Sequence, residues 1–137
     1  MRTREKILSD FMKNFIITER QERCFFELLN KRELFIRRLS HNIQNIFKMK
    51  LLKKISKNDD FKDNIQKLLN IENREECYIV SNDSFDNHIV PINEAIDIVY
   101  GQGLGSLFMN LKSTKIFLEA EQEQGPPDRF IGIREYK

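Results

Sequence analysis

His88 is the residue whose type and neighbours come nearest to an acid–base site. Asp83 and Asp86 lie close to it in the sequence, and a carboxylate can orient an imidazole for general-base catalysis. His41 is the only other histidine. No serine or cysteine stands in a recognisable nucleophile pattern, and turns rich in Asp and Asn are common. We therefore expect no catalytic residues and no enzyme activity.

A glycine run, from Gly101 to Gly105, has the composition of a phosphate-binding loop. Such a loop needs the order strand, glycines, helix, so that the helix N-terminus points at the phosphate. Here a predicted helix precedes the glycines and a predicted strand follows them, and the Gly-Lys-Ser/Thr signature is missing. The run is therefore predicted to stop a helix and lead into a strand, and we expect no cofactor.

Cysteine usage and the N-terminal segment both favour a cytoplasmic protein. Cys24 and Cys77 are too few for a disulfide scaffold and have no zinc-ligand spacing. They are predicted to be buried thiols in a reducing compartment, with no metal site. The apolar residues between 7 and 17 are interrupted by polar and charged ones, which is typical neither of a signal peptide nor of a membrane span.

Acidic residues of the second half of the chain are the candidate binding residues. Residues 1–71 hold 17 Lys and Arg and 9 Asp and Glu, a difference of +8, whereas residues 72–137 hold 6 and 12, a difference of −6. Such a split indicates a strongly charged partner, or two halves that attract each other. Alternate glutamates at 119–123 would share one strand face, either as a solvated edge or as an acidic patch for a basic partner. The predicted partner-binding set is Asp83, Asp86, Glu119, Glu121, Glu123 and Asp128.

A basic stretch at residues 34–58 supplies the alternative function, a nucleic-acid-binding module. Phe35 and Phe47 lie within it, but at spacings that suit a hydrophobic core. The stretch lacks a helix-turn-helix glycine, an aromatic RNA-binding motif and a zinc pattern, so we predict no specific reading of nucleic acid. Its cations are Arg37, Arg38, Lys48, Lys50, Lys53, Lys54 and Lys57, with no acidic residue among them.

Helices are predicted for the first half of the chain. Apolar residues at helical spacing indicate an amphipathic helix over residues 4–16. Thr18-Glu19-Arg20-Gln21 has the form of a capping box and should start a second helix, which either stops near Ser40 and Asn42 or continues through Phe47. A short third helix is predicted around residues 61–69.

Strands dominate the second half. A β-prone run at 76–81 precedes a helix that begins near Pro91 and ends at Gly101. Period-two alternation then predicts three antiparallel strands, at 104–111, 114–121 and 129–133, in a half-buried sheet. The predicted core face of this sheet consists of Leu107, Met109, Leu111, Ile116, Leu118, Ile131 and Ile133.

The predicted fold class is α+β, with N-terminal helices followed by a β-α-β-β-β unit and a mainly antiparallel four-stranded sheet. We expect a single domain spanning 1–137, with a helical part (1–71) and a mixed sheet part (72–137). The sequence leaves open whether the helical part packs on the sheet or protrudes from it.

The chain resembles the immunity proteins of bacterial contact-dependent growth inhibition and related polymorphic-toxin systems. The resemblance rests on the small α+β domain, the richness in Asn, Ile, Lys and Phe, the lack of a catalytic motif and the charged, turn-rich sheet half. It implies a cytoplasmic antidote that binds one cognate toxin domain, commonly a nuclease, and blocks its active site. The net charge of +2 differs from the strongly acidic type of nuclease inhibitor. No membrane partner is expected, and the toxin's identity and the oligomeric state are left open.

Overall fold

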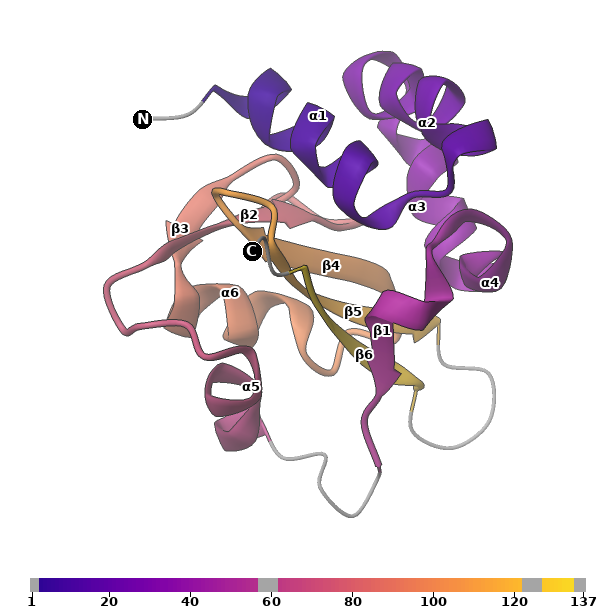
Figure 1. Ribbon diagram of the computed structural model, residues 1–137. Helices are drawn as coiled ribbons and strands as arrows, with labels where there is room; N and C mark the ends of the chain where they lie inside the picture. Colours follow the sequence, from indigo (N-terminus) through magenta and orange to yellow (C-terminus); the bar gives the residue numbers. More distant parts are fainter. Residues whose placement is uncertain (1–2, 57–61, 122–126, 135–137) are drawn as a thin grey trace.

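A six-stranded antiparallel sheet lies between two layers of helices in the computed structural model, which describes residues 3–56, 62–121 and 127–134 (Figure 1). The spatial order of the strands is β1-β6-β5-β4-β2-β3. Their bounds are β1 (Leu52–Lys54), β2 (Glu76–Val80), β3 (Ile89–Pro91), β4 (Leu104–Asn110), β5 (Lys115–Glu121) and β6 (Arg129–Ile133). The predicted α+β class is confirmed, with six strands in place of four.

The N-terminal helices form a layer on one face of the sheet, above it in Figure 1. The hydroxyl of Thr3 caps α1 by accepting the N–H of Lys6 at 3.1 Å. Apolar side chains of the helices pack with Leu107, Met109 and Leu118 in one core. The layer consists of α1 (Arg4–Phe15), α2 (Thr18–Asn30), α3 (Arg32–His41), α4 (Ile43–Ile46) and the 3-10 turn η1 (Met49–Leu51). The helical part therefore packs on the sheet.

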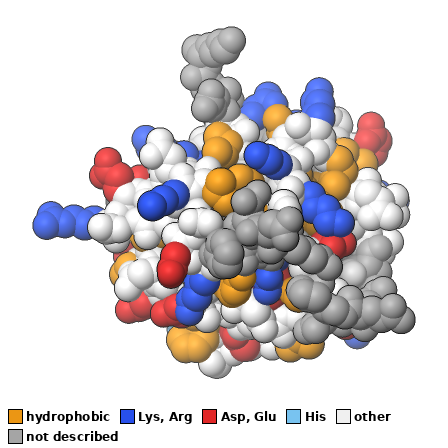
Figure 2. All heavy atoms as spheres, turned by 90° about the horizontal axis from the view of Figure 1, so that it is seen from below, with side chains coloured by type: hydrophobic (Ala, Val, Ile, Leu, Met, Phe, Trp, Pro, Cys, Tyr) orange, Lys and Arg blue, Asp and Glu red, His pale blue; other side chains and the backbone are white. Residues whose placement is uncertain are grey.

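Two further helices, α5 (Lys62–Leu69) and α6 (Ile92–Val99), cover the opposite face. A second core there contains Phe108 and Phe117, whose rings stack at 5.5 Å between centroids. The sheet is thus buried on both faces. The sequence had predicted burial on one face only. Among the described side chains visible on the outside of this layer, acidic and basic ones are interspersed (Figure 2).

The second predicted helix begins at Thr18, but the predicted capping box does not form. The N-cap residue is Ile17, with no side-chain capping bond, and the Gln21 side chain donates instead to the carbonyl of Ile16 at 3.0 Å. The N–H of Ile17 donates to the carbonyl of Ile46 at 2.9 Å. Pairing between two chain segments, which local sequence cannot reveal, fixes the start of α2.

The same helix ends earlier than predicted, because Lys31 leaves the helical region at φ −145° and ψ 63°. Chain reversal there brings α3 back against α2, and a second break follows at Asn42. Glu27 of α2 holds the reversal, because Arg38 of α3 donates to both its carboxylate oxygens at 2.8 Å. The Arg38 side chain keeps the pKa of Glu27 below its ordinary value, outweighing the effect of burial.

The predicted core face of the sheet was wrong for Ile131 and Ile133. Ile131 pairs with Phe117, and Leu118 pairs with Phe130. Directly opposed residues point to the same face, so the two isoleucines pack in the α5/α6 core. A strand's alternation does not fix its register against a neighbour.

Strands β1 and β3 were also missed. Each is three residues long and lies at an edge of the sheet. Leu52 of β1 pairs with Gly132, and two exposed lysines follow it, so no apolar alternation marks the strand. Pro91 ends β3 and also precedes α6, which explains why the sequence indicated only a helix start there.

Candidate partner-binding surface

The candidate acidic residues gather at one end of the sheet. β2 ends beside the start of β4, because Val80 pairs with Leu107, and β4 starts beside the end of β5, because Leu104 pairs with Glu121. The start of β6 lies at the same end. We call this region the acidic end of the sheet, defined by Asp83, Asp86, Glu119, Glu121 and Asp128. Glu123, the sixth predicted residue, lies outside the described residues.

Glu119 is buried, contrary to the prediction that it faces a partner. Its Oε1 accepts the Nε–H of Arg129 at 2.8 Å, and Arg129 is also buried. The guanidinium of Arg129 lies 4.0 Å from the centroid of the Tyr100 ring. Glu119 cannot contact a partner from this position, because its side chain is fully buried and paired with Arg129.

Two N–H groups of the glycine run bind an anion, which is the carboxylate of Glu119 in the same chain. The backbone N–H of Gly101 donates to Oε1 at 2.7 Å, and that of Gly103 donates to Oε2 at 2.9 Å. Both glycines have positive φ, 88° and 69°, which a residue with Cβ rarely adopts. The run follows a helix and precedes a strand, as predicted, and its N–H groups are occupied within the chain.

Asp86 is held by Arg32, the first residue of α3. Nε and Nη2 of Arg32 donate to the two carboxylate oxygens at 2.6 and 2.7 Å, a bidentate geometry. The backbone N–H of Ser81 donates to the same carboxylate at 3.0 Å. Asp86 therefore connects the β2–β3 loop (residues 81–88) to α3 through Arg32.

Asp83 ties this loop together and joins it to the glycine run. Its Oδ1 accepts the hydroxyl of Ser81 at 2.7 Å and the N–H of Phe85 at 2.9 Å, and its Oδ2 accepts from the amide of Gln102. Partial burial acts to raise the pKa of Asp83, but these hydrogen bonds outweigh it and the pKa lies below its ordinary value. The carboxylate is exposed enough to meet a partner while it orders two loops.

The remaining candidates lie further along the same end. Glu121 is the last residue of β5 and is half-buried. Asp128 is exposed, and Lys54 of the edge strand forms an ion pair with it at 3.2 Å. Strands are spaced about 4.8 Å apart, so the surface from Asp128 to Asp83 spans roughly three strand spacings.

Two exposed apolar residues at this end were not found by sequence reasoning. Phe85 is 43% exposed and Leu104 is 49% exposed. The hydrogen bond from Gln102 to Asp83 joins the loop that contains Phe85 to the glycine run that precedes Leu104. Phe85 also meets the His88 ring edge-on, 5.9 Å between centroids. Exposed aromatic and aliphatic side chains on ordered loops are typical of protein–protein contacts.

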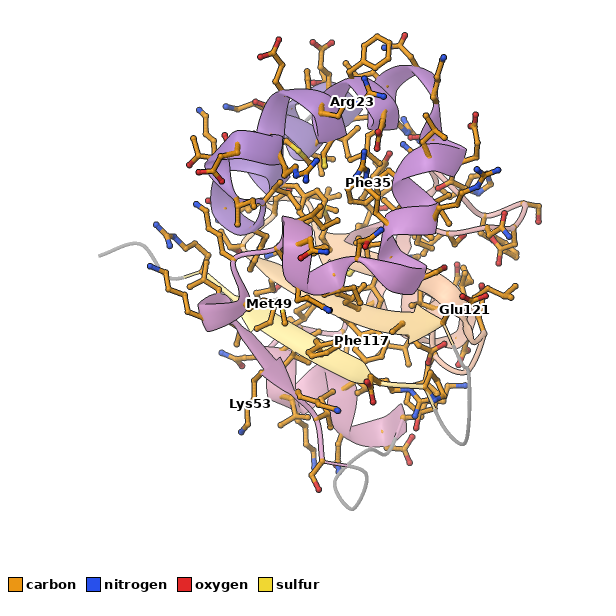
Figure 3. All side chains as sticks on the ribbon, turned by 90° about the vertical axis from the view of Figure 1, so that its right-hand side faces the viewer. Arg23, Phe35, Met49, Lys53, Phe117 and Glu121 are labelled. Carbon is orange, nitrogen blue, oxygen red and sulfur yellow. The ribbon has the colours of Figure 1, made fainter. Side chains whose placement is uncertain are left out.

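The cations of the basic stretch are spread over several elements, and some have partners within the chain. Arg38 pairs with Glu27, Lys54 pairs with Asp128, and the amine of Lys48 donates to the carbonyl of Lys13 at 2.7 Å. Met49 and Lys53 lie well away from Glu121 in Figure 3. Lys57 lies outside the described residues. Three of these cations therefore have partners within the protein.

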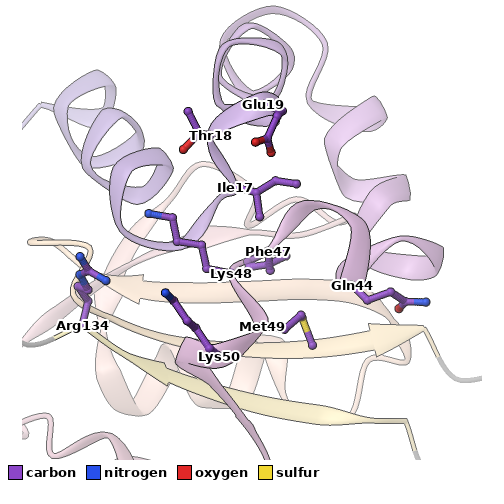
Figure 4. Close-up of a pocket in the computed structure, with 9 residues that line it drawn as sticks. All are labelled: Ile17, Thr18, Glu19, Gln44, Phe47, Lys48, Met49, Lys50 and Arg134. Carbon is purple, nitrogen blue, oxygen red and sulfur yellow. The ribbon is translucent and has the colours of Figure 1, made fainter.

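A pocket of about 620 Å³ lies between the start of α2 and η1 (Figure 4). Ile17, Phe47 and Met49 contribute apolar walls. Lys48 and Lys50 carry cations into it, but Lys48 already bonds a carbonyl of α1 and Glu19 contributes the opposite charge. Gln44, Thr18 and Arg134 complete the lining. The pocket brings together none of the predicted site residues.

The two cysteines lie apart from each other, in different cores. Cys24 lies in the α1–α4 core and Cys77 in the α5/α6 core, and burial raises the pKa of both thiols. Across residues 3–56, 62–121 and 127–134, no three His, Cys, Asp or Glu side chains are placed to hold a metal ion. Within the same ranges, no helix is long and apolar enough to cross a bilayer.

No family model, curated protein or solved structure matches this chain.

Proposed function

We propose that this protein is an immunity protein that binds a cognate toxin domain in the cytoplasm and blocks its active site. The observation that carries the proposal is the exposure of Phe85 in the β2–β3 loop and of Leu104 at the start of β4, next to segments that internal carboxylates hold in place. Loops ordered in advance lose less conformational freedom on binding, which favours affinity. An inhibitor needs such a rigid surface and no catalytic group of its own.

A nuclease domain is the kind of toxin that suits this surface. A nuclease must hold a polyanion, so its cleft is expected to be basic. Asp83 and Asp128 are exposed at the acidic end of the sheet and would oppose that cleft. Charges at the rim of an interface mainly raise the association rate, whereas apolar groups at its centre limit dissociation. Phe85 and Leu104 would therefore carry most of the affinity, with the carboxylates steering the encounter.

Co-expression tests the proposal. The products of the reading frames on either side of this gene are expressed in bacteria one at a time, and any product that stops growth is expressed again with the intact protein or with an empty vector. Growth restored by the intact protein supports the proposal. No protection together with no complex on gel filtration contradicts it.

Salt dependence separates the alternative, a nucleic-acid-binding module, from this proposal. Non-specific attraction of the cations in residues 34–58 to DNA or RNA should weaken steeply with salt. We expect no binding tighter than micromolar to a defined oligonucleotide at physiological salt. Sub-micromolar binding under those conditions would favour the alternative.

A further inference from the structure

All five N–H donors of Arg32 have acceptors, and these acceptors join three parts of the chain. Nε and Nη2 bond both oxygens of Asp86 at 2.6 and 2.7 Å, and Nη2 also approaches the Ile79 carbonyl at 3.5 Å. Nη1 donates to the Tyr78 hydroxyl at 2.7 Å and to the Leu28 carbonyl at 3.2 Å. A guanidinium has five donors in a fixed fork, so no other side chain could make this set of contacts.

The contacts continue into the β2–β3 loop. The Tyr78 hydroxyl donates to Oδ1 of Asn87 at 2.6 Å, and the backbone of Asn87 has a positive φ of 70°. Arg4 of α1 donates to the carbonyl of the same asparagine at 2.9 Å. The end of the loop that leads into β3 is thus fixed to α1 through Asn87. The start of the loop, at Ser81, is fixed through Asp86.

We infer that Arg32 is a positioning residue that holds the β2–β3 loop, through Asp86, in its binding conformation before a partner arrives. The inference rests on the proposed function for its biological meaning, because Phe85 lies within that loop. The Arg32 and Asp86 side chains are only 18% and 21% exposed. Competition from water is weak at such burial, so the ion pair can define the loop conformation.

The direct test is amide hydrogen exchange of residues 82–88 in the free protein. Arg32→Lys keeps the charge but cannot make the fork, and we expect exchange in the loop to become at least tenfold faster. The matched control is Arg38→Lys, which breaks a bidentate pair with Glu27 in the same helix α3. We expect the control to lower global stability without accelerating exchange in the loop.

Asp86→Asn gives a second route if Arg32→Lys does not fold. Asparagine keeps the shape of aspartate and loses its charge, so exchange in the loop should again accelerate. Exchange unchanged from the parent in both Arg32 and Asp86 variants would overturn the inference. So would equal acceleration in the Arg38 control, because that result indicates general loosening of the fold.

Binding to a toxin domain that the intact protein neutralises in the co-expression experiment supplies the functional arm. A loss of affinity of at least tenfold for Arg32→Lys, with affinity retained by Arg38→Lys, supports the positioning role. A loosened loop with parental affinity overturns that role in binding. Hydrogen exchange uses no partner, so a failure of the proposed function leaves its result intact and is recognised separately.

Discussion

The carboxylate of Glu119 accepts the Nε–H of Arg129 at 2.8 Å, and both side chains are buried beneath the glycine run. The backbone N–H groups of Gly101 and Gly103 complete the coordination of that carboxylate. A residue expected to face a partner therefore supports, from inside, the glycine run that leads into β4 and its first residue, Leu104. The distinction matters because a buried charge and an exposed charge respond very differently to substitution.

Glu119→Gln should cost about 3–5 kcal/mol of unfolding free energy, because it removes a buried charge that the Arg129 guanidinium and two backbone N–H groups bond. Asp128→Asn is the control. It breaks an ion pair with Lys54 whose side chains are 48% and 58% exposed, and should cost at most about 1 kcal/mol. Denaturant titration measures both. Equal costs would show that the Glu119 pair is solvated.

Leu118→Ala should cost about 2–5 kcal/mol, because Leu118 is fully buried in the core under α1–α4 and its loss leaves a cavity. Leu68→Ala, at an exposed position of α5, should cost far less. A loss below about 0.5 kcal/mol at Leu118 in denaturant titration would contradict the assigned face of β5.

Gly105→Ala should be more destabilising than Gly101→Ala by at least about 1 kcal/mol. Both glycines have positive φ, so both substitutions strain the backbone. Only at Gly105 would the new Cβ also lie 2.9 Å from the hydroxyl oxygen of Ser40 in α3, whereas the space at Gly101 is open. Thermal or denaturant unfolding compares the two variants, and equal losses would show that α3 does not pack on the start of β4.

Stability should fall in alkaline solution because of Cys77. Burial raises the pKa of its thiol to about 12, from an ordinary value of 9.0. The unfolded chain therefore releases this proton above pH 9 while the folded protein keeps it until about pH 12, so the stabilisation present below pH 9 is lost across that window. The slope is about −1.4 kcal/mol per pH unit for one group. Cys77→Ala should flatten the dependence of unfolding free energy on pH by that amount, and an unchanged slope would contradict the burial of the thiol.

Local pattern was sufficient to predict most of the elements. The apolar spacing before Phe15 predicted α1, and the alternation after Leu104 predicted β4, β5 and β6 to within a residue or two at each end. These signals are local because the period of a helix or strand repeats within a few residues. The short edge strands lack that repetition, and Lys31 carries no sequence signal for the break between α2 and α3.

Contacts between distant residues explain what the sequence could not reveal about the site. The pattern of charges selected residues in predicted turns and on one predicted strand, but it did not show that Asp83, Asp128 and Glu121 would lie at one end of the sheet. It could not show that Glu119 would be neutralised by Arg129 and two backbone N–H groups, because that depends on the register of β5 with β6. Exposed apolar residues also carry no sequence signature, since Phe85 looks like any core phenylalanine until the loop is folded.

The affinity of a surface variant for a toxin domain that the intact protein neutralises on co-expression tests the central claim most directly. The variant combines Phe85→Ser with Leu104→Ser, and the control is Leu68→Ser on the opposite helical layer. Isothermal titration calorimetry should show at least a hundredfold loss of affinity, about 2.7 kcal/mol, for the double variant and parental affinity for the control. Folding of each variant is checked by circular dichroism. Parental affinity in a folded double variant would contradict the claim, and the exposed Phe26 and Leu29 of α2 would become the better candidates.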